Sequence, residues 1–560
     1  MKTKECMVNF ISVLVAAALF SLAFPNIIIE KGFPLALWAA YIPLFLLIYR
    51  TKARVCPFWG ALYGALSMFL FNYWLASFHF SAAILLVCLF ALYYAAFSLV
   101  LKLSALLLPR HGYLVQTLLW VAFEYARTLG FFGYPYGISG YSQWTLLPLV
   151  KIADIGGVWA VSLLMIFPQA FIASIINCAV HKTKFNHEPH KPHEKTPLYS
   201  ESKGQKKQKN FPLRFFLQFR PLLIWFVVLC AALVYGSASK LDYSESEKIK
   251  VALVQVNSDP WKSDVREFRL ELDVLRRLSD LVLSEVPPPE LVVWSETAFV
   301  PSFNYHKRHR VNAESTALVL DAEAYLSAQS VPFIIGNDEG HFVTDIDGSE
   351  RLAHYNAALL FADGELSPQH YYKMKLVPFS EYFPYGGAFP EIYRFMEKQV
   401  THFWDEGQTP YVFEVNGLQF STPICFEDSF GSISREFVLG GARLIVNMSN
   451  DSWSHSLPGQ NQHLGMAVFR AIENRRSLVR ATTSGQTCAI DPNGKIIAEA
   501  EPFIETAISV EAPLISSRTL YTRLGDMLPL VCAGLAALGL ILGIIYTIMR
   551  CRGHSMPSVL

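Results

Sequence analysis

Long apolar runs with few charges are the feature that most restricts how this chain can fold. A helix needs about 20 mostly apolar residues to cross the hydrocarbon core of a bilayer. The run at 81–101 is long enough and carries no charged residue at all. The candidate spans are 7–25, 31–49, 56–79, 81–101, 112–132, 155–178, 221–238 and 528–549. The sequence therefore predicts an α-helical transmembrane bundle of about eight helices.

The overall composition agrees with a chain that is partly solvated by lipid. Hydrophobic residues make up 52% of the 560 residues and charged residues only 17%, which is too apolar for a typical soluble protein. The formal net charge of +1 gives no reason to expect a nucleic acid partner. The nine cysteines show neither a disulfide framework nor metal-ligand spacing, and no nucleotide motif is present, so we expect no metal and no cofactor.

The distribution of Lys and Arg predicts the orientation in the membrane. Basic residues precede the first span, lie between spans two and three, four and five, and six and seven, and follow the last span. Cytoplasmic loops carry the excess of Lys and Arg, so the N-terminus is expected in the cytoplasm. The predicted domains are then a seven-helix transmembrane domain at 1–240, an extracytoplasmic domain at 247–515 and a C-terminal transmembrane helix at 527–549.

Residues 181–210 are polar and poor in hydrophobics. We expect them to form a disordered cytoplasmic loop, because such a composition cannot bury enough apolar surface to fold. Metal binding by the histidines of this loop is the alternative, but their spacing is irregular.

The fifth span carries two charged residues, Glu124 and Arg127. Their i, i+3 spacing allows them to meet on one helix face. Charges at membrane depth are costly and are usually paired or functional. Two interpretations stay open: an ion pair near the outer interface, or contacts to a lipid headgroup or to the extracytoplasmic domain.

Residues 247–515 alternate between strand-like and helix-like segments, which predicts an α/β layered domain with a mixed sheet. Three short apolar strands end in polar residues, namely LVVWSE at Glu296, FSTPIC at Cys425 and RLIVNMSN at Asn450. Ligands of such domains bind beyond the carboxyl ends of the strands. Lys373 lies in a nearby loop rich in proline and aromatic residues.

A cysteine, a lysine and several glutamates are a suitable set for acyl transfer. A thiolate attacks a carbonyl far better than a thiol does, so the cysteine needs a base or a positive charge close by. A buried carboxylate can take the proton. A lysine ammonium, with the backbone N–H after the nucleophile, can stabilise the oxyanion that forms.

Several motifs resemble the Glu–Lys–Cys pattern of the nitrilase, or carbon–nitrogen hydrolase, superfamily. They are WSETAFVP with Glu296, KMKLVPFSE with Lys373 and Glu381 eight positions apart, and ICFED around Cys425. NDSWS and RAIENRRSLVRATTSG are similar to later motifs of that superfamily. In the membrane half, residues 120–141 and 156–164 resemble apolipoprotein N-acyltransferases. The resemblance implies a nitrilase-like αββα sandwich beside the helical bundle.

The resemblance also implies roles for individual residues. Cys425 matches the nucleophile, Glu296 the general base and Lys373 the lysine that stabilises the oxyanion. Lys375 is a competing lysine, but the spacing to Glu381 favours Lys373. Glu381 is expected to support the site.

Other assignments are weaker. Glu427 is a further supporting residue, and Trp261 matches an aromatic residue near acyl-chain or acceptor contacts, with core packing as its alternative. Phe426 stands where family members often have Tyr, and we expect it among the substrate-binding residues. His463 is expected to be a satisfied polar group outside the mechanism, and Asp451 a turn-forming residue. The apolar and aromatic segments within 379–404 are expected either as lids at the membrane interface or as core.

The activity implied is lipoprotein maturation in the bacterial inner membrane, with the catalytic domain on the periplasmic side. A phospholipid would donate an acyl chain to Cys425 as a thioester. The N-terminal amine of a diacylglyceryl-cysteine on an apolipoprotein would then accept it. A membrane-anchored nitrilase-type amidase that hydrolyses a small amide is the first alternative. A transporter with a ligand-binding domain is the second, but no internal repeat supports it.

Overall fold

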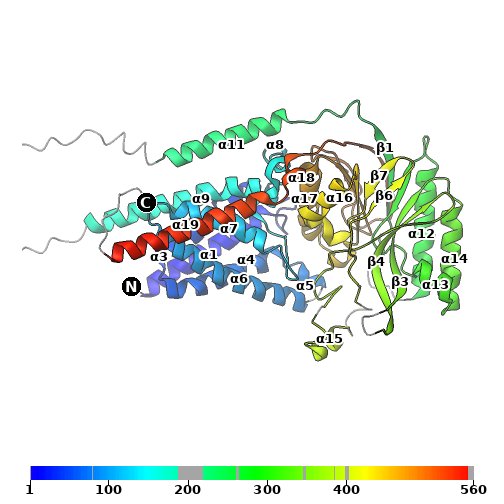
Figure 1. The fold of residues 1–560 in the computed structure, drawn as a ribbon, viewed down its shortest axis with the longest axis horizontal. Helices are drawn as coiled ribbons and strands as arrows, with labels where there is room; N and C mark the ends of the chain where they lie inside the picture. Colours follow the sequence, from blue (N-terminus) through cyan, green and yellow to red (C-terminus); the bar gives the residue numbers. More distant parts are fainter. Residues whose placement is uncertain are drawn as a thin grey trace, which may run out of the picture.

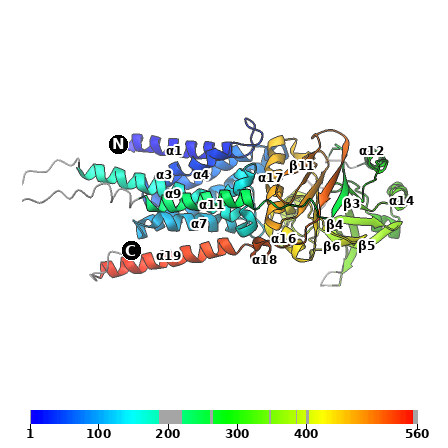
Figure 2. The ribbon, with the colours of Figure 1, turned by 90° about the horizontal axis from the view of Figure 1, so that it is seen from above.

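The computed structural model describes residues 2–78, 80–186, 219–259, 264–344, 348–383, 385–397 and 403–552. A helical bundle forms one end of an elongated molecule and a two-sheet α/β domain forms the other (Figure 1). The labelled N and C ends both lie on the bundle side, far from the sheets (Figures 1 and 2). Residue 261 and most of the predicted loop at 181–210 fall outside the described residues.

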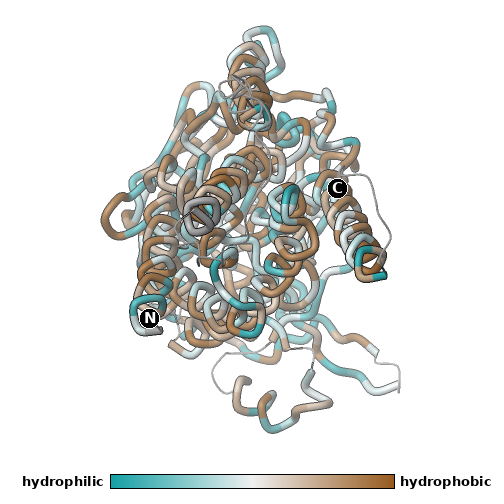
Figure 3. Tube along the Cα trace, turned by 90° about the vertical axis from the view of Figure 1, so that its left-hand side faces the viewer, coloured by the Kyte–Doolittle hydropathy of each residue, from teal (hydrophilic) through white to brown (hydrophobic). Residues whose placement is uncertain are grey.

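The bundle agrees with the predicted transmembrane domain. In the described part of the chain, 6 helices are long and apolar enough to cross a membrane. Viewed from the bundle end, apolar residues predominate along these helices (Figure 3). The six are α1 (Lys2–Ala23), α4 (Cys56–Phe71), α6 (Phe80–Leu107), α9 (Ala153–Asn186), α11 (Arg220–Ala238) and α19 (Met527–Cys551).

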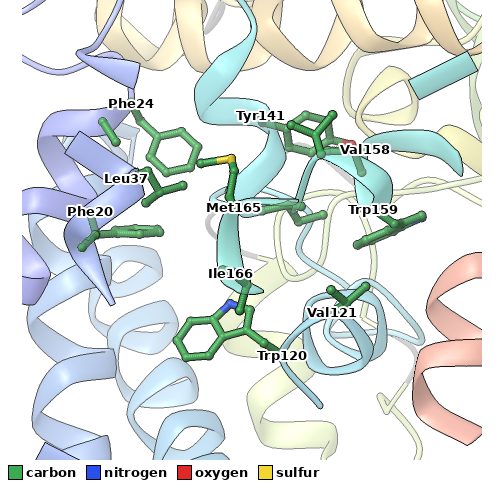
Figure 4. Close-up of a cluster of buried hydrophobic side chains, with 14 of the residues drawn as sticks. Phe20, Phe24, Leu37, Trp120, Val121, Tyr141, Val158, Trp159, Met165 and Ile166 are labelled. Atoms are coloured by element: carbon green, nitrogen blue, oxygen red, sulfur yellow. The ribbon is translucent and has the colours of Figure 1, made fainter. Parts of the chain in front are cut away.

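The other two predicted spans are shorter in the structure. The span at 31–49 is divided into η1 (Pro34–Ala36), α2 (Leu37–Ala40) and α3 (Ile42–Arg50), and the span at 112–132 contains only α7 (Gly112–Ala126). Proline near the start of η1 and of α3 fits a new helix start but not the middle of a continuous helix. Trp120 and Val121 of α7 are fully buried among the longer helices (Figure 4). The short connecting elements are η2 (Ala53–Val55), α5 (Leu75–Phe78), η3 (Ser139–Gln143) and α8 (Leu147–Val150).

The α/β domain contains two six-stranded sheets. The first sheet has the order β12-β1-β2-β3-β4-β5 and the second β11-β10-β9-β8-β7-β6. The first consists of β1 (Lys248–Gln255), β2 (Leu291–Trp294), β3 (Phe333–Thr344), β4 (Glu350–Ala362), β5 (Glu365–Tyr372) and β12 (Thr506–Pro513). The second consists of β6 (Val412–Val415), β7 (Leu418–Ser421), β8 (Leu444–Ser449), β9 (Ser477–Thr482), β10 (Cys488–Ile490) and β11 (Ile496–Glu499). In both sheets the central strands are parallel and the outer ones antiparallel, so the predicted mixed sheet is present twice.

Successive side chains along a strand point to opposite faces of its sheet, and this alternation explains the layers of the α/β domain. Val251 of β1 faces the core between the two sheets, and the next residue, Ala252, faces helices on the outer side of the first sheet. Those outer helices are α12 (Val265–Leu283) and α14 (Ala313–Ser327), while α16 (Gly431–Leu439) and α17 (Leu457–Asn474) cover the second sheet. The order helix, sheet, sheet, helix confirms the predicted αββα sandwich. The remaining elements are α13 (Phe303–His309), α15 (Pro390–Glu397), η4 (Cys425–Ser429), η5 (Ser452–Ser454) and α18 (Leu520–Leu524).

Helix α17 lies between the second sheet and the bundle. Leu464 and Phe469 belong to one continuous apolar cluster that includes Phe20 of α1 and Ile445 of β8. Gln462 donates hydrogen bonds to the carbonyls of Pro25 and Phe71 at the end of the bundle, at 3.0 and 3.1 Å. The α/β domain is therefore docked on the bundle through a buried helix.

Glu124 and Arg127 hold one segment of this junction and do not pair with each other in the described structure. The Glu124 carboxylate accepts the backbone N–H of Ser139 at 3.0 Å and the hydroxyl of Ser162 at 2.7 Å. The Arg127 guanidinium donates to the backbone carbonyls of Tyr134 and Tyr136 at 2.9 and 2.8 Å. The two charges fix the 130–144 segment against the bundle, so the ion pair, one of the two interpretations left open, is not found among the described residues.

Replacing Glu124 with Ala should lower the thermal unfolding midpoint in detergent. The substitution leaves the Ser139 N–H and two buried hydroxyls without their acceptor, a loss of about 2–4 kcal/mol. Replacing Glu5, which is exposed in the first turn of α1, is the control and should change the midpoint little. Equal midpoints for the two variants would contradict this role of Glu124.

Candidate active site

The ends of three strands bring the predicted carboxylate, ammonium and thiol together. Glu296 follows β2, Lys373 follows β5, and Cys425 begins η4 shortly after β7. The Lys373 ammonium lies 3.1 Å from a Glu296 oxygen and 2.7 Å from a Glu381 oxygen. Lys373 is fully buried, and burial of a charge requires such partners.

Groups from both sheets hold Glu296 in place. Its Oε1 accepts the side-chain amide of Asn356 at 2.7 Å, and its Oε2 accepts the backbone N–H of Asn450 at 2.7 Å. Asn356 lies in β4 of the first sheet, whereas Asn450 directly follows β8 of the second. The carboxylate thus sits where the edges of the two sheets meet.

Cys425 lies at a sharp turn between strand and helix. Its φ of 49° falls in the left-handed region, which is costly for a residue with a side chain. Such strain persists only where the surrounding structure enforces it, and it is frequent at functional sites. The side chain is 7% exposed. Burial and the Glu296 carboxylate raise the pKa of the thiol well above its usual value, while Lys373 acts in the opposite direction. The resting sulfur is therefore a neutral thiol.

The Lys373 ammonium keeps its proton. Burial by itself would lower its pKa, but Glu296 and Glu381 together raise that pKa well above the usual value. Two of its three N–H bonds are directed to these two carboxylates. The third has no acceptor among the described residues and remains available for a developing oxyanion.

Glu427 joins the turn at Cys425 to the loop that begins at Lys373. Its Oε1 accepts the Tyr371 hydroxyl at 2.7 Å and the backbone N–H groups of Met374 and Lys375 at 2.7 and 3.0 Å. Its Oε2 accepts the N–H of Ile424 at 2.7 Å. Burial raises the pKa of this carboxyl to about 7. Glu427 therefore contacts backbone on both sides of the site and makes no ion pair with the Lys373 ammonium in the described structure.

A second charged cluster lies behind the turn at Cys425. His463 of α17 bonds Asp428 at 2.6 Å and Asp451 at 3.3 Å, and Arg480 of β9 bonds Asp451 at 2.9 Å and also contacts Asp428. Burial lowers the pKa of His463, but the two carboxylates raise it to a value above normal. His463 is a satisfied polar group as predicted, whereas Asp451 is part of a buried ion network that the sequence reading missed. The sequence did carry a signal for such a network. In QNQHLGMAVF, residues 460–469 of α17, polar residues interrupt an otherwise apolar helix and need buried partners.

The remaining predicted residues lie at the edge of the site. The Lys375 ammonium donates to the carbonyl of Gly130 at 2.8 Å, so it contacts the membrane half. The carboxylates of Glu296 and Glu381 pair with Lys373 instead. Phe426 packs edge-on against Phe430 with ring centroids 5.0 Å apart. Trp261 lies outside the described residues. Phe395 of α15 is 65% exposed, and α15 lies apart from the sheets near the end of the bundle (Figure 1).

Comparison with known proteins gives matches over both halves of the chain. The family model described as Carbon-nitrogen hydrolase matches residues 250–520. The model described as Apolipoprotein N-acyltransferase N-terminal domain matches residues 16–171. Apolipoprotein N-acyltransferase 1 of Treponema pallidum is 42% identical over 551 residues, 97% of each chain. The protein with the same name from Treponema denticola is 39% identical over 537 residues, 94% of each chain. A solved mutant of a Nesterenkonia amidase from the nitrilase superfamily is 18% identical, with a TM-score of 0.34, and the match covers 47% of this chain and 90% of that one.

Replacing Glu427 with Gln should disrupt the site although the side chains are nearly isosteric. All four contacts of Glu427 come from donors, and the new NH₂ group would face at least one of them. We expect a loss of about 1–3 kcal/mol in the free energy of unfolding. Thermal unfolding measures this loss, with the exposed Glu414 replaced by Gln as control. A variant as stable as the control would contradict the arrangement.

The pH dependence of Cys425 alkylation tests the electrostatics of the thiol. Because the pKa of Cys425 is raised, iodoacetamide should react slowly at neutral pH and faster as the pH rises past the ordinary thiol range. Replacing Glu296 with Gln removes a charge that raises this pKa, so the rise should move to lower pH. Mass spectrometry of Cys425 gives the rate profile. A shift to higher pH in the Gln variant would refute this assignment of the charges.

Proposed function

Since the chain belongs to the apolipoprotein N-acyltransferases, we propose that Cys425 carries an acyl chain from a phospholipid to the N-terminal amine of a diacylglyceryl-cysteine. The protein is an N-acyltransferase of a bacterial membrane, and lipoproteins are its substrates. The proposal concerns the acyl donor, the residues that carry the reaction and the side of the membrane. One observation carries it, namely the buried Lys373 between Glu296 and Glu381, with its electrostatic influence on the Cys425 thiol.

In the first half-reaction the thiol is acylated. Glu296 takes the proton of Cys425 as the sulfur attacks the ester carbonyl, because the resting thiol is neutral. Lys373 and the backbone N–H after the nucleophile stabilise the oxyanion. The tetrahedral intermediate then expels the glycerol oxygen, which receives the proton from Glu296. The products are a thioester at Cys425 and a lysophospholipid.

In the second half-reaction the amine of the acceptor attacks the thioester. Glu296 removes the proton that the amine loses on forming the amide bond, and Lys373 stabilises the second oxyanion. Collapse of this intermediate expels the sulfur of Cys425, and the proton held by Glu296 returns to it. Glu381 keeps Lys373 in position and charged throughout, while Glu427 fixes the backbone just before the nucleophile and just after Lys373.

Both proposed substrates are anchored in lipid, which supports a site close to the bilayer surface. The turn at Cys425 contacts α17 through the bond of Asp428 to His463, and α17 packs on the end of the bundle. The basic loops predicted to be cytoplasmic belong to the opposite end, where the labelled chain ends also lie (Figure 2). We therefore assign the catalytic domain to the periplasmic side of the inner membrane.

Hydrolysis of a small amide uses the same three residues with water as acceptor. The relatives named N-acyltransferases match nearly the full length of the chain, bundle included, which disfavours this alternative. Release of ammonia from small amides would separate the two activities.

Incubation of the detergent-solubilised enzyme with phospholipid should add the mass of one acyl chain to Cys425. Replacing Cys425 with Ala should abolish both this adduct and N-acylation of a diacylglyceryl peptide, since a covalent intermediate is required. Replacing Cys488, which is buried in β10, with Ala is the matched control and should retain the adduct. Intact-protein mass spectrometry measures the adduct, and an adduct that persists in the Cys425 variant would end the proposal.

A further inference from the structure

The membrane half packs an aromatic side chain against the catalytic domain. Phe131 lies in the 130–144 segment, which two buried charges fix to the bundle as described above. The centroid of its ring lies 5.3 Å from that of Phe379, 6.2 Å from that of Tyr382 and 5.5 Å from that of Tyr385. One ring of the membrane half therefore contacts three rings of the catalytic domain.

The residues on either side of Phe131 contribute less to this aromatic contact. Phe132 is 39% exposed, and in the described part of the chain it reaches one ring of the catalytic domain, that of Phe379, at 6.0 Å. Gly130 accepts a hydrogen bond from the Lys375 ammonium at 2.8 Å. Aromatic pairs at such separations stabilise a contact beyond the area that they bury. Phe132 is therefore the matched control for Phe131.

Two of the contacted rings belong to a turn, residues 377–382, that also contains Glu381. The Glu381 N–H donates to the carbonyl of Val377 at 3.0 Å, and the Glu381 Oε2 accepts the N–H of Val377 at 2.8 Å. Phe379 has a φ of 67°, in the left-handed region that is costly for a residue with a side chain. Such a backbone persists only where the surrounding structure enforces it. By packing on this turn before and after Glu381, Phe131 supplies part of that constraint.

The turn is connected directly to the catalytic ammonium. The Oε1 of Glu381 lies 2.7 Å from the Nζ of Lys373, which is fully buried. A buried ammonium stays charged only beside its carboxylate partners, and Glu381, together with Glu296, raises the pKa of Lys373. A displacement of the turn therefore separates Lys373 from one of these two partners.

We propose that Phe131 is a positioning residue for acyl transfer, because its ring holds the 377–382 turn where Glu381 meets Lys373. This rests on the proposed function, in which the Lys373 ammonium stabilises both oxyanions. Phe131 acts on the reaction through Glu381. The catalytic centre is then complete only when this turn of the catalytic domain is seated on the membrane half.

The test compares Phe131→Ala with Phe132→Ala in the full-length enzyme. Single-turnover acylation of Cys425 by phospholipid in mixed micelles, followed by intact-protein mass spectrometry, should be about 10- to 100-fold slower in Phe131→Ala, since small displacements of catalytic groups are costly. Phe132→Ala should stay within about threefold of wild type. Phe131→Tyr keeps the ring and should acylate at the wild-type rate.

Two further measurements distinguish positioning from a general loss of structure. In enzyme that already carries Glu381→Ala, Phe131→Ala should slow acylation by less than about threefold, because the interaction through which Phe131 acts is already gone. Loss of the Glu381 contact also lowers the pKa of Lys373, so the alkaline fall in the acylation rate should begin at lower pH in Phe131→Ala than in Phe132→Ala. This pH profile decides alone if Glu381→Ala is inactive.

Three results would each overturn the inference: acylation by Phe131→Ala within about threefold of wild type, equal slowing by Phe131→Ala with and without Glu381→Ala, or an unchanged alkaline fall. Failure of the wild-type enzyme to form the adduct would instead overturn the proposed function and the inference with it.

Discussion

The burial of α17 on all sides is the constraint on which the rest of the structure depends. Every residue from Gly459 to Asn474 is buried, although the helix carries several polar and charged side chains. A buried polar group is tolerated only when it is hydrogen-bonded, and a buried charge only when it is paired. Gln462 donates a hydrogen bond to the carbonyl of Pro25 in the bundle, and His463 bonds Asp428 behind the turn at Cys425. Arg470 pairs with Glu473 and donates to the carbonyl of Ser429. One helix thereby fixes the α/β domain to the bundle in a single position.

The turn at Cys425 is held from three directions as a consequence. Glu427 binds the backbone of the turn and of the loop that begins at Lys373, Arg480 and His463 hold Asp428, and Arg470 holds the last residue of η4. Such a number of contacts accounts for the left-handed backbone of Cys425, which would relax in a less constrained loop. A rigid turn also keeps the sulfur at a constant place relative to the buried ammonium, as the proposed catalysis by preorganised charges requires.

The bundle and the α/β domain make further contacts beside those of Gln462. Gly465 of α17 approaches Trp144 of the membrane half so closely that a Cβ would lie 3.2 Å from its ring. Val158 at the kink of α9 donates its N–H to Glu473 at 3.0 Å, and Gly130 accepts from Lys375. These contacts join residues more than 200 positions apart in the chain. A catalytic domain separated from the bundle would expose α17 and leave its polar groups without partners.

The sequence by itself determined the two classes of structure and predicted the chemistry of the site. Apolar runs of bilayer length require helices, and the strand–helix alternation of 247–515 requires a layered α/β domain. Spaced motifs identified Glu296, Lys373 and Cys425. Only the tertiary structure decided which charges pair, because pairing depends on distances between segments remote in sequence. Glu124 and Arg127 are near neighbours in the sequence, yet each binds the 130–144 segment, which only the folded chain places beside them.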